Sequence, residues 1–462
     1  MSRGSPLSSL LTTDYWGVPL SHSGSHKSYR PLTSLTFKLN WLLAGPSPLT
    51  FHLTNVLLHG LVSLLLTHLV SGLCPASPGL AELTGLIFSV LPVHCEAVAG
   101  VVGRADILAA LLSLLTLLVH QHWGSSLATA LLATLAMLAK EQGVTVLGVC
   151  CLLDIISTKL SLQDKQKRIL RSGLSLIIIL SLRAIFLGGE LPTFSRADNP
   201  ASHSDSRLTR ALTFLYLPVF NMMLLVCPST LSYDWSMSSI PLLTSITDSR
   251  NIVSLAFYSL LLCFTSKLLL TFYQQFEPTT PVHFCSPWKT NLSKTRRAGS
   301  TSTTRGSSNT PGLSPQLRRS QIETISLIAL ALSLIILPFL PATNILFYVG
   351  FVVAERLLYL PSLGYSLLVA LGARRLTRLQ PLLARLGLLV LLLSAGLRTI
   401  ARNTDWENEE TLFKSGLTVN PAKSFSNLGN ILYAKGQLKD SEIVFKEAIR
   451  WRPNMADTHY NL

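Results

Sequence analysis

Long apolar runs constrain this chain more than any other feature. Gly173–Gly188, Asn251–Leu270 and Thr324–Leu340 carry at most one charged residue each. A helix of roughly 20 such residues crosses the hydrocarbon core of a bilayer. A soluble helical core would instead need a polar face on each helix, which these runs lack. Only 13% of the chain is charged, about half the share of a soluble protein. The sequence therefore predicts an all-α, polytopic membrane protein.

About ten transmembrane helices are predicted, together with one further apolar segment. The ten ranges are 52–72, 81–99, 105–120, 125–139, 143–157, 173–189, 251–272, 322–340, 357–372 and 383–400. Segment 209–229 is also apolar, but it contains Pro218, Asn221 and Pro228. Membranes tolerate an interrupted helix where protein covers its free backbone groups. We therefore expect a re-entrant or broken element there, which does not add a crossing.

The basic residues predict the orientation of the chain. They give a formal net charge of +15 and gather in Lys159–Arg171, Lys289–Arg319 and Arg374–Arg385. Cytosolic loops are enriched in Lys and Arg, and ten crossings place all three segments on one side. The other side, lumenal or exterior, receives residues 1–50, 190–250, 341–356 and the C-terminal region. No basic patch is interleaved with aromatic residues, so nucleic-acid binding is not predicted.

The same reading divides the chain into five parts. They are a lumenal loop (1–50), the first part of a transmembrane region (51–272), a disordered basic cytosolic linker (273–320), the last part of the transmembrane region (321–402) and a lumenal repeat region (403–462). The linker is assigned from its Ser, Thr, Gly and Pro content. Seven cysteines occur without a C-x-x-C motif, so neither a disulfide framework nor a zinc site is predicted. His94 and Glu96 are too few ligands for a metal site.

The C-terminal region carries a tetratricopeptide-repeat pattern, a helix pair of about 34 residues. One full repeat covers 422–455, and ADTHYNL then opens a second in the same register. The residues predicted to pack the two helices are Phe425, Leu428, Gly429, Phe445, Ala448 and Pro453. A single unit cannot bury its apolar face alone. We therefore expect the array to continue beyond Leu462.

Polar residues collect in the loops predicted to be lumenal. Arg, Lys and His beside a membrane supply the donors and counter-charge that a lipid-linked phosphate needs. Nearby carboxylates can act as a base towards an acceptor hydroxyl. Each motif also has a plainer interpretation. His22 and His26 fit solvated loop positions, whereas Lys140–Glu141 and Glu355–Arg356 fit interfacial charges that extend to water. Asp234 fits an anchor of an interfacial loop.

Eight motifs in this order resemble the transmembrane and tetratricopeptide-repeat (TMTC) O-mannosyltransferases, in particular their second subfamily. They are DYWG, SHSGSHKSYRPL, FHLTNVLLH, PVHCEAVAGVVGRAD, AKEQGVTVLGV, DWSM, AERLLYLPSLGYS and NPAKSFSNLGN. The resemblance implies a GT-C glycosyltransferase, multi-pass in the endoplasmic reticulum membrane. It implies transfer of mannose from dolichyl-phosphate mannose to Ser or Thr of cadherin-type domains, which the repeats would hold. It implies no definite cofactor.

One departure from the family pattern bears on activity. Members carry an additional first span and a first lumenal loop with an acidic pair, the expected catalytic acid. This chain starts after that point, and Asp14 matches a different family position. The resemblance therefore implies a chain truncated at both ends and inactive as given.

Within the transferase hypothesis, the candidate catalytic carboxylates are Asp14, Glu96, Asp106 and Glu141. The candidate ligands of the donor phosphate are His22, His26, Lys27, Arg30, Arg104 and Arg356. The alternative is a non-catalytic membrane scaffold whose lumenal repeats bind a partner. A transporter ranks last, because it would place ionisable residues near the bilayer midplane. Here Asp154 and Lys267 lie at the ends of spans.

Overall fold

The protein is helical throughout the residues that its structure describes. The structure, a computed structural model, describes residues 8–75, 77–157, 159–189, 194–276 and 315–462. Across these ranges, β-structure is confined to one isolated bridge between Thr13 and Pro19. The predicted all-α class is confirmed.

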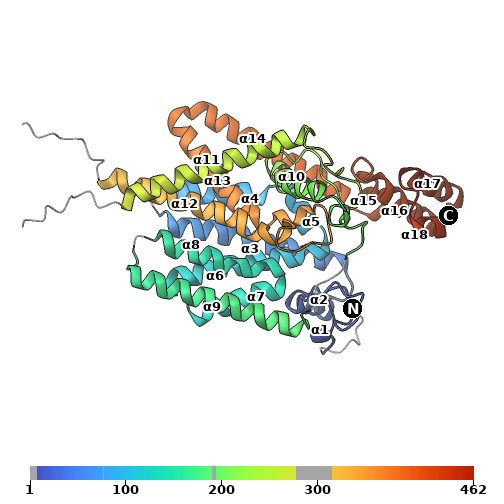
Figure 1. The fold of residues 1–462 in the computed structure, drawn as a ribbon, viewed down its shortest axis with the longest axis horizontal. Coiled ribbons are helices and arrows are strands. Elements are labelled where there is room, and N and C mark those ends of the chain that lie inside the picture. Colours follow the sequence, from blue (N-terminus) through green and yellow to red (C-terminus); the bar gives the residue numbers. More distant parts are fainter. Residues whose placement is uncertain (1–7, 76, 158, 190–193, 277–314) are drawn as a thin grey trace, which may run out of the picture.

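Long helices lie side by side along the longest axis of the molecule (Figure 1). They are α3 (Pro48–Leu73), α4 (Pro78–Ser89), α6 (Arg104–Trp123), α7 (Leu127–Ala139), α8 (Val146–Ile156), α9 (Leu162–Phe186), α11 (Arg250–Phe276), α12 (Pro315–Phe339), α13 (Pro361–Leu379) and α14 (Pro381–Asp405). The remaining α-helices lie at one end. They are α1 (Ser9–Thr12), α2 (Pro31–Ala44), α5 (Cys95–Val98), α10 (Arg207–Val226), α15 (Glu409–Ser415), α16 (Pro421–Ala434), α17 (Leu438–Trp451) and α18 (Ala456–Asn461).

The two ends of the bundle differ in what they carry. The repeat helices α15–α18 and the first described residues lie at the right-hand end in Figure 1, here named the repeat end. The free ends of α11 and α12 lie at the left, here named the linker end. The α8–α9 and α13–α14 connections also lie at the linker end, and the basic segments Lys159–Arg171 and Arg374–Arg385 extend from them into the adjoining helices. The third basic segment falls largely outside the described residues. The described geometry thus agrees with the predicted separation of basic segments from repeats.

Seven described helices are long and apolar enough to cross a membrane, or eight if a bent pair counts as one span. Six of them and the bent pair, Gly79–Ser89 with Pro92–Val98, coincide with predicted spans. The predicted ranges 125–139, 143–157 and 357–372 are helical but do not meet this test. Helices α7 and α8 have 13 and 11 residues, about 20 Å or less against a core of about 30 Å. Helix α13 carries three arginines. The predicted number of ten is thus too high by this test.

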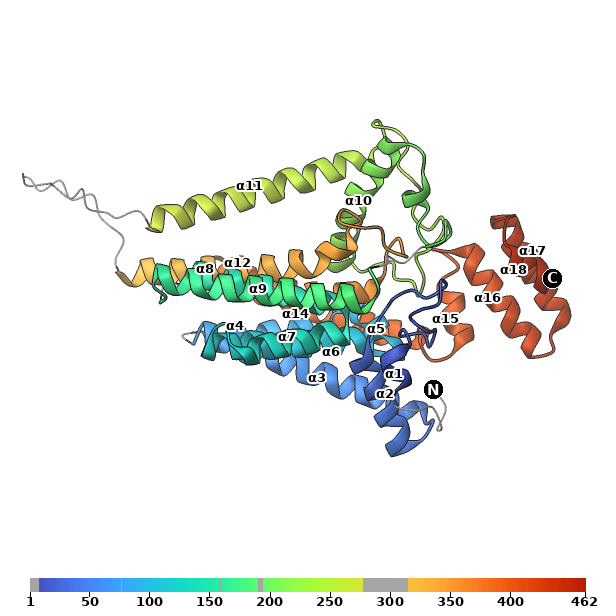
Figure 2. The same cartoon turned by 60° about the horizontal axis from the view of Figure 1, so that its bottom comes forward.

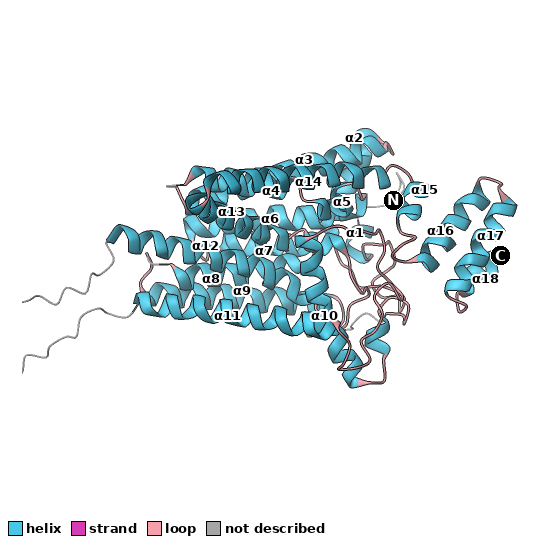
Figure 3. Ribbon diagram, turned by 90° about the horizontal axis from the view of Figure 1, so that it is seen from above, coloured by secondary structure: helices cyan, strands magenta, loops and turns pink. Residues whose placement is uncertain are grey.

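The prediction of a broken element at 209–229 is wrong. Helix α10 is one continuous helix of 20 residues that includes Pro218. Leu217 and Val219 beside the proline are buried. This packing compensates for the one backbone hydrogen bond that is lost because proline has no N–H group. Helix α10 also meets the length and hydropathy test for a span. It nevertheless runs across the direction of the long helices at the repeat end (Figures 2 and 3).

Residues 8–50, the described part of the predicted loop, contain two helices, α1 and α2. Helix α2 begins at Pro31, whose fixed φ suits the first helical position. The Thr33 hydroxyl donates to the Ala139 carbonyl at 2.8 Å and so fastens α2 to the end of α7. The sequence before the first span therefore includes a helix, α2, that packs at the repeat end.

Helices α16 and α17 form the predicted helix pair. A Cβ atom at Gly429 would stand 2.5 Å from the Phe445 ring, so only glycine permits this approach. The Ser441 hydroxyl also donates to the Gly429 carbonyl at 2.8 Å. Of the six predicted packing residues, Leu428, Gly429, Phe445 and Ala448 are buried, Phe425 is half-buried and Pro453 is exposed after α17.

Candidate functional site

Eight charged residues meet in the turns that join the long helices at the repeat end. We name them the charged cluster: Arg30, Glu96, Arg104, Asp106, Lys140, Glu141, Arg183 and Arg356. These residues lie at or beside the ends of six helical elements, namely α2, α5, α6, η3 (Glu141–Thr145), α9 and η6 (Glu355–Leu358), which bring them together. Five cations face three carboxylates, a formal net charge of +2. The arrangement favours an anion.

Glu141 joins two arginines from distant parts of the chain. Its carboxylate accepts from Arg30 Nε at 3.0 Å and Nη2 at 2.9 Å, and from Arg183 Nη2 at 3.0 Å. Burial would raise the pKa of Glu141, but the two guanidinium groups outweigh it and lower that pKa to about 2. Glu141 is therefore an ionised bridge, and the bridge leaves one net positive charge.

Lys140 and Asp106 form a buried ion pair next to this bridge. Both residues are less than 5% exposed. Burial lowers the pKa of Lys140 to about 8, and the neighbouring Arg30 and Arg356 act in the same direction, whereas Asp106 opposes them. Because the pair is desolvated, Asp106 is held in place and is not presented to solvent.

Glu96 and Arg356 make the loosest pair of the cluster. The Glu96 carboxylate accepts from the Arg356 backbone N–H at 2.8 Å, while its other oxygen lies 3.6 Å from the Arg356 guanidinium. The Arg356 side chain is 33% exposed, compared with 16% for Arg30 and 13% for Arg183. Arg356 is thus the cation of this cluster most accessible to a ligand.

Arg104 has a different position from the one expected of a phosphate ligand. It is fully buried, donates to Asn55 Oδ1 at 2.7 Å and to the Phe51 carbonyl at 3.0 Å, and also bonds Asn40. Its guanidinium lies 4.5 Å from the centre of the Phe37 ring. These contacts fasten the start of α6 to α2 and α3, and they occupy donors that a ligand would need.

The first loop is folded around Asp14. One carboxylate oxygen accepts from the backbone N–H groups of Trp16 and Val18, and the other from Ser25 Oγ and the His26 N–H. A carboxylate with four such bonds organises its own loop. The structure therefore shows Asp14 as an anchor of the loop, at 3% exposure.

The other predicted first-loop ligands differ in exposure. His22 is exposed and accepts from the Gly24 N–H, and His26 is exposed and stacks on Phe194. Lys27 is buried, and its ammonium group donates to the Leu20 carbonyl at 2.8 Å. Only Arg30, of the four predicted first-loop ligands, is placed by these contacts in the charged cluster.

Sequence reasoning missed Arg183 and Tyr15. Arg183 is the single charge in the run Gly173–Gly188, which was a usable signal. The Tyr15 hydroxyl donates to the Val102 carbonyl at 2.9 Å, and Arg30 lies 5.1 Å from the centre of its ring. Burial raises the pKa of Tyr15 to about 12. The phenol thus stays neutral and orients Arg30.

Glu355, which the sequence pattern assigned to an interfacial pair, is fully buried. It lies in η6 (Glu355–Leu358) and accepts from the Ser232 N–H at 2.5 Å and from Trp235 Nε1 at 3.1 Å. Its second oxygen has no hydrogen-bond partner in the described structure. Burial raises the pKa of this carboxyl above its ordinary value, and the nearby Glu96 adds to the shift.

Glu355→Gln is therefore expected to stabilise the protein at alkaline pH. The amide oxygen can keep both hydrogen bonds while the buried charge is removed. The pKa of Glu355 is higher in the folded protein than in the unfolded chain. The wild type is therefore most stable at pH values below the pKa of the unfolded chain, and it loses stability as pH rises through the pKa of the folded state. Melting temperatures in detergent between pH 5 and pH 9 should fall less in the variant. An unchanged pH dependence would contradict this assignment.

The segment around Tyr233 connects the cluster with the repeats. The Tyr233 hydroxyl lies 3.3 Å from Ser424 Oγ and accepts from Asn427 at 3.2 Å. Asn420, which caps α16, donates to Asp234 at 2.9 Å. Because Glu355 binds Ser232 and Trp235 of the same segment, the repeats have a defined position relative to the cluster.

Known proteins similar to this chain carry one family name. The family model described as "Protein O-mannosyl-transferase TMTC, DUF1736" matches residues 188–262. The Homo sapiens "Protein O-mannosyl-transferase TMTC2" is 40% identical over 98% of this chain and 59% of its own length. The Drosophila melanogaster "Protein O-mannosyl-transferase Tmtc1" is 37% identical over 99% of this chain and 58% of its own length. The chain is thus similar to members of the TMTC family.

This chain spans about three-fifths of the length of those relatives. The Mus musculus "Protein O-mannosyl-transferase TMTC3" is 34% identical over 99% of the chain and 48% of its own length. No solved structure matches this chain. The helices described above therefore carry the structural argument.

Proposed function

We propose that this protein acts in O-mannosylation in the endoplasmic reticulum membrane, moving mannose from dolichyl-phosphate mannose to Ser or Thr of secretory proteins. The names of its relatives support mannosyl transfer. The observation that carries the proposal is the net positive charged cluster at the end of the bundle where the repeats are docked. A lipid-linked donor reaches such a site from the membrane, and a protein acceptor reaches it from the repeats.

The cations would stabilise the leaving group. In the transfer, a bond forms between the acceptor oxygen and the anomeric carbon of mannose while the bond from that carbon to the phosphate oxygen breaks. The lipid phosphate gains negative charge as it leaves. Preorganised cations aimed at developing charge lower the barrier. Arg356 and Arg30 suit this role, since Arg356 is accessible and Arg30 is held by Glu141 and Tyr15.

Glu96 is the carboxylate best suited to take the acceptor proton. Its contact with the Arg356 guanidinium is long at 3.6 Å, whereas Asp106 and Glu141 are in tight pairs. A donor phosphate that draws Arg356 away would free one Glu96 oxygen. The other oxygen would still accept the Arg356 backbone N–H, so the carboxylate would remain oriented for general base catalysis.

The repeats would hold the acceptor, for which the resemblance suggests cadherin-type domains. Their contacts with Tyr233 and Asp234 fix them at the same end as the cluster. A scaffold without catalysis would use the same repeats and would not depend on the cations. The two functions therefore differ in how they respond to loss of charge at Arg356.

Arg356→Gln is expected to reduce mannose transfer by about ten- to a hundredfold, because the variant loses one charge-assisted hydrogen bond to the phosphate, which contributes ~1.5–3 kcal/mol. The protein is produced in cells that lack related transferases, and O-mannose on cadherin-type domains is measured by mass spectrometry. Arg250→Gln is the matched control, because Arg250 is also at the repeat end but pairs with Asp248. Equal activity of the two variants would contradict the phosphate role. Acceptor binding without transfer by the wild type would favour the scaffold.

A further inference from the structure

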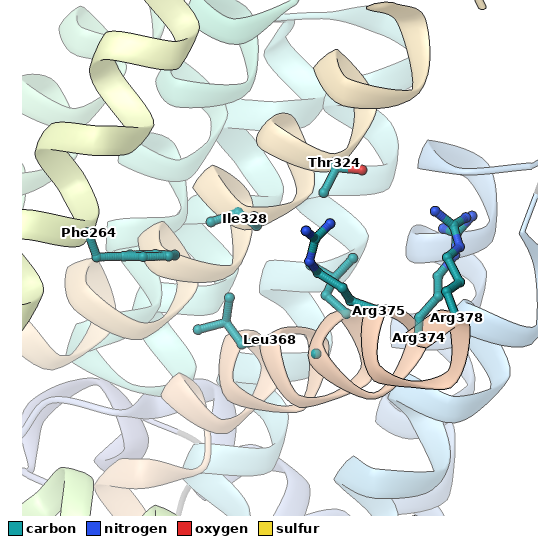
Figure 4. A pocket seen from close by; sticks show the side chains of 9 residues that line it. Phe264, Thr324, Ile328, Leu368, Arg374, Arg375 and Arg378 are labelled. Carbon is teal, nitrogen blue, oxygen red and sulfur yellow. The ribbon is translucent and has the colours of Figure 1, made fainter. Parts of the chain in front are cut away.

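Two cavities flank the last turns of α13 at the linker end, opposite the charged cluster. One, of about 260 Å³, lies among α11, α12 and α13 (Figure 4). The other, of about 380 Å³, lies between α13 and the start of α4. Arg374 and Arg378 line both cavities, and Arg375 lines the first. One helix thus places three arginines at the first cavity and two of them also at the second.

These arginines carry uncompensated charge. No ion pair joins any of the three to a carboxylate within the ranges that the structure describes. The carboxylates on the neighbouring helices, Glu82 and Glu323, line neither cavity. In Figure 4 the guanidinium of Arg375 extends towards α12, and those of Arg374 and Arg378 lie together, apart from it. Arg374 and Arg378 together provide several donors for one anion, and Arg375 adds a further positive charge to the first cavity.

Apart from Thr324, the rest of the first cavity is lined by apolar residues and a glycine. Phe264, Ile328, Leu368 and Leu371 line it, and Gly372 leaves open space where a side chain would stand. Helix α11 is almost unburied along its apolar length, so this lining continues onto a surface that suits acyl chains. The cavity thus pairs cations with a hydrocarbon surface.

The depth of the cavity suits a lipid phosphate. Thr324 lines it and stands three residues inside the apolar span that begins at Gln321, about 4.5 Å along the helix. The guanidinium groups therefore lie near the boundary between hydrocarbon and head groups, where long basic side chains reach phosphates.

We propose that the cavities around Arg374, Arg375 and Arg378 form a binding site for an acidic glycerophospholipid. The phosphate lies on the arginines, and one acyl chain follows the apolar surface between α11 and α12. A choline phospholipid carries its own cation and leaves the three arginines uncompensated. This site is separate from the donor site of the proposed transferase, and it does not depend on transfer activity.

The test is lipid retention by the purified protein. The protein in detergent is titrated with phosphatidylglycerol or with phosphatidylcholine of the same chains, and bound lipid is counted by native mass spectrometry. Replacing all three arginines with glutamine should weaken phosphatidylglycerol binding at least about tenfold, since each basic residue contributes to attraction of anionic lipid. Binding of phosphatidylcholine should not change.

Two further variants keep the result interpretable. Lys159→Gln with Lys167→Gln and Arg171→Gln removes three charges at the same end but outside both cavities, and it should leave binding unchanged. Gly372→Leu fills open space without altering charge, and it should also weaken binding. Equal loss in the charge control would overturn the site, as would full retention by the Gly372 variant. Displacement of the lipid by glycerol 3-phosphate at similar concentration would show a head-group anion site and overturn the lipid assignment.

Discussion

Gly103→Ala is expected to lower the melting temperature strongly and to reduce mannose transfer about a hundredfold or more. A Cβ atom at Gly103 would lie 2.7 Å from the carbonyl carbon of Ala97 and closer still to its carbonyl oxygen and Cα atom. These are backbone atoms, so α5 and the start of α6 would have to separate. Overpacking typically costs about 1–3 kcal/mol, and we expect the upper end here. Arg104 and Asp106 follow directly, and a displacement of about 1 Å near a site costs roughly 10²-fold in rate.

The matched control for this change is Gly60→Ala. Gly60 lies in α3, and a methyl group added there would meet no atom within 4 Å. The same substitution should therefore leave stability and transfer close to wild type. Thermal unfolding in detergent and mass spectrometry of O-mannose measure the two effects. Similar melting temperatures for both variants would show that α5 and α6 do not depend on this close approach.

Glu141→Gln is expected to destabilise the protein by roughly 2 kcal/mol. The change leaves Arg30 and Arg183 close together without their shared carboxylate. Breaking a fully buried pair costs about 3–5 kcal/mol, and we expect less because the Glu141 side chain is 34% exposed. The pKa of Glu141 is lowered from 4.5 to about 2. Its contribution is therefore present above pH 4.5 and is lost as pH falls towards 2, so the variant should lose less stability on acidification.

Glu410→Gln is the matched control for the bridge. Glu410 also contacts two cations, Lys414 and Lys435, and its pKa is likewise lowered to about 2. It lies on the surface of the repeat region, where solvent and salt screen the pair. The control should change the melting temperature much less. Equal losses would indicate that the charged cluster is no more desolvated than the surface.

The sequence alone determined the helical membrane architecture and the C-terminal helix pair. Apolar length is a local property, so the runs around α3, α6, α9, α11, α12 and α14 could be read directly. Basic segments predicted which connections share one end of the bundle. The C-terminal helix pair could also be predicted, because Gly429 and Phe445 occur at the spacing that the repeat pattern requires. Motif order then indicated the family that the comparisons support.

Tertiary structure decided the direction of α10 and the partners of each charge. Helix α10 has the length and hydropathy of a span, and only its packing shows that it lies across the bundle. Asp14, Glu141 and Glu355 looked alike as loop carboxylates. One is saturated by its own loop, one bridges two arginines, and one is buried with an unpartnered oxygen. The environments of Glu141 and Glu355 depend on residues far apart in the sequence: Arg30 and Glu141 are 111 positions apart, and Ser232 and Glu355 are 123 apart. Pairing and burial depend on distance in space, which local sequence patterns do not encode.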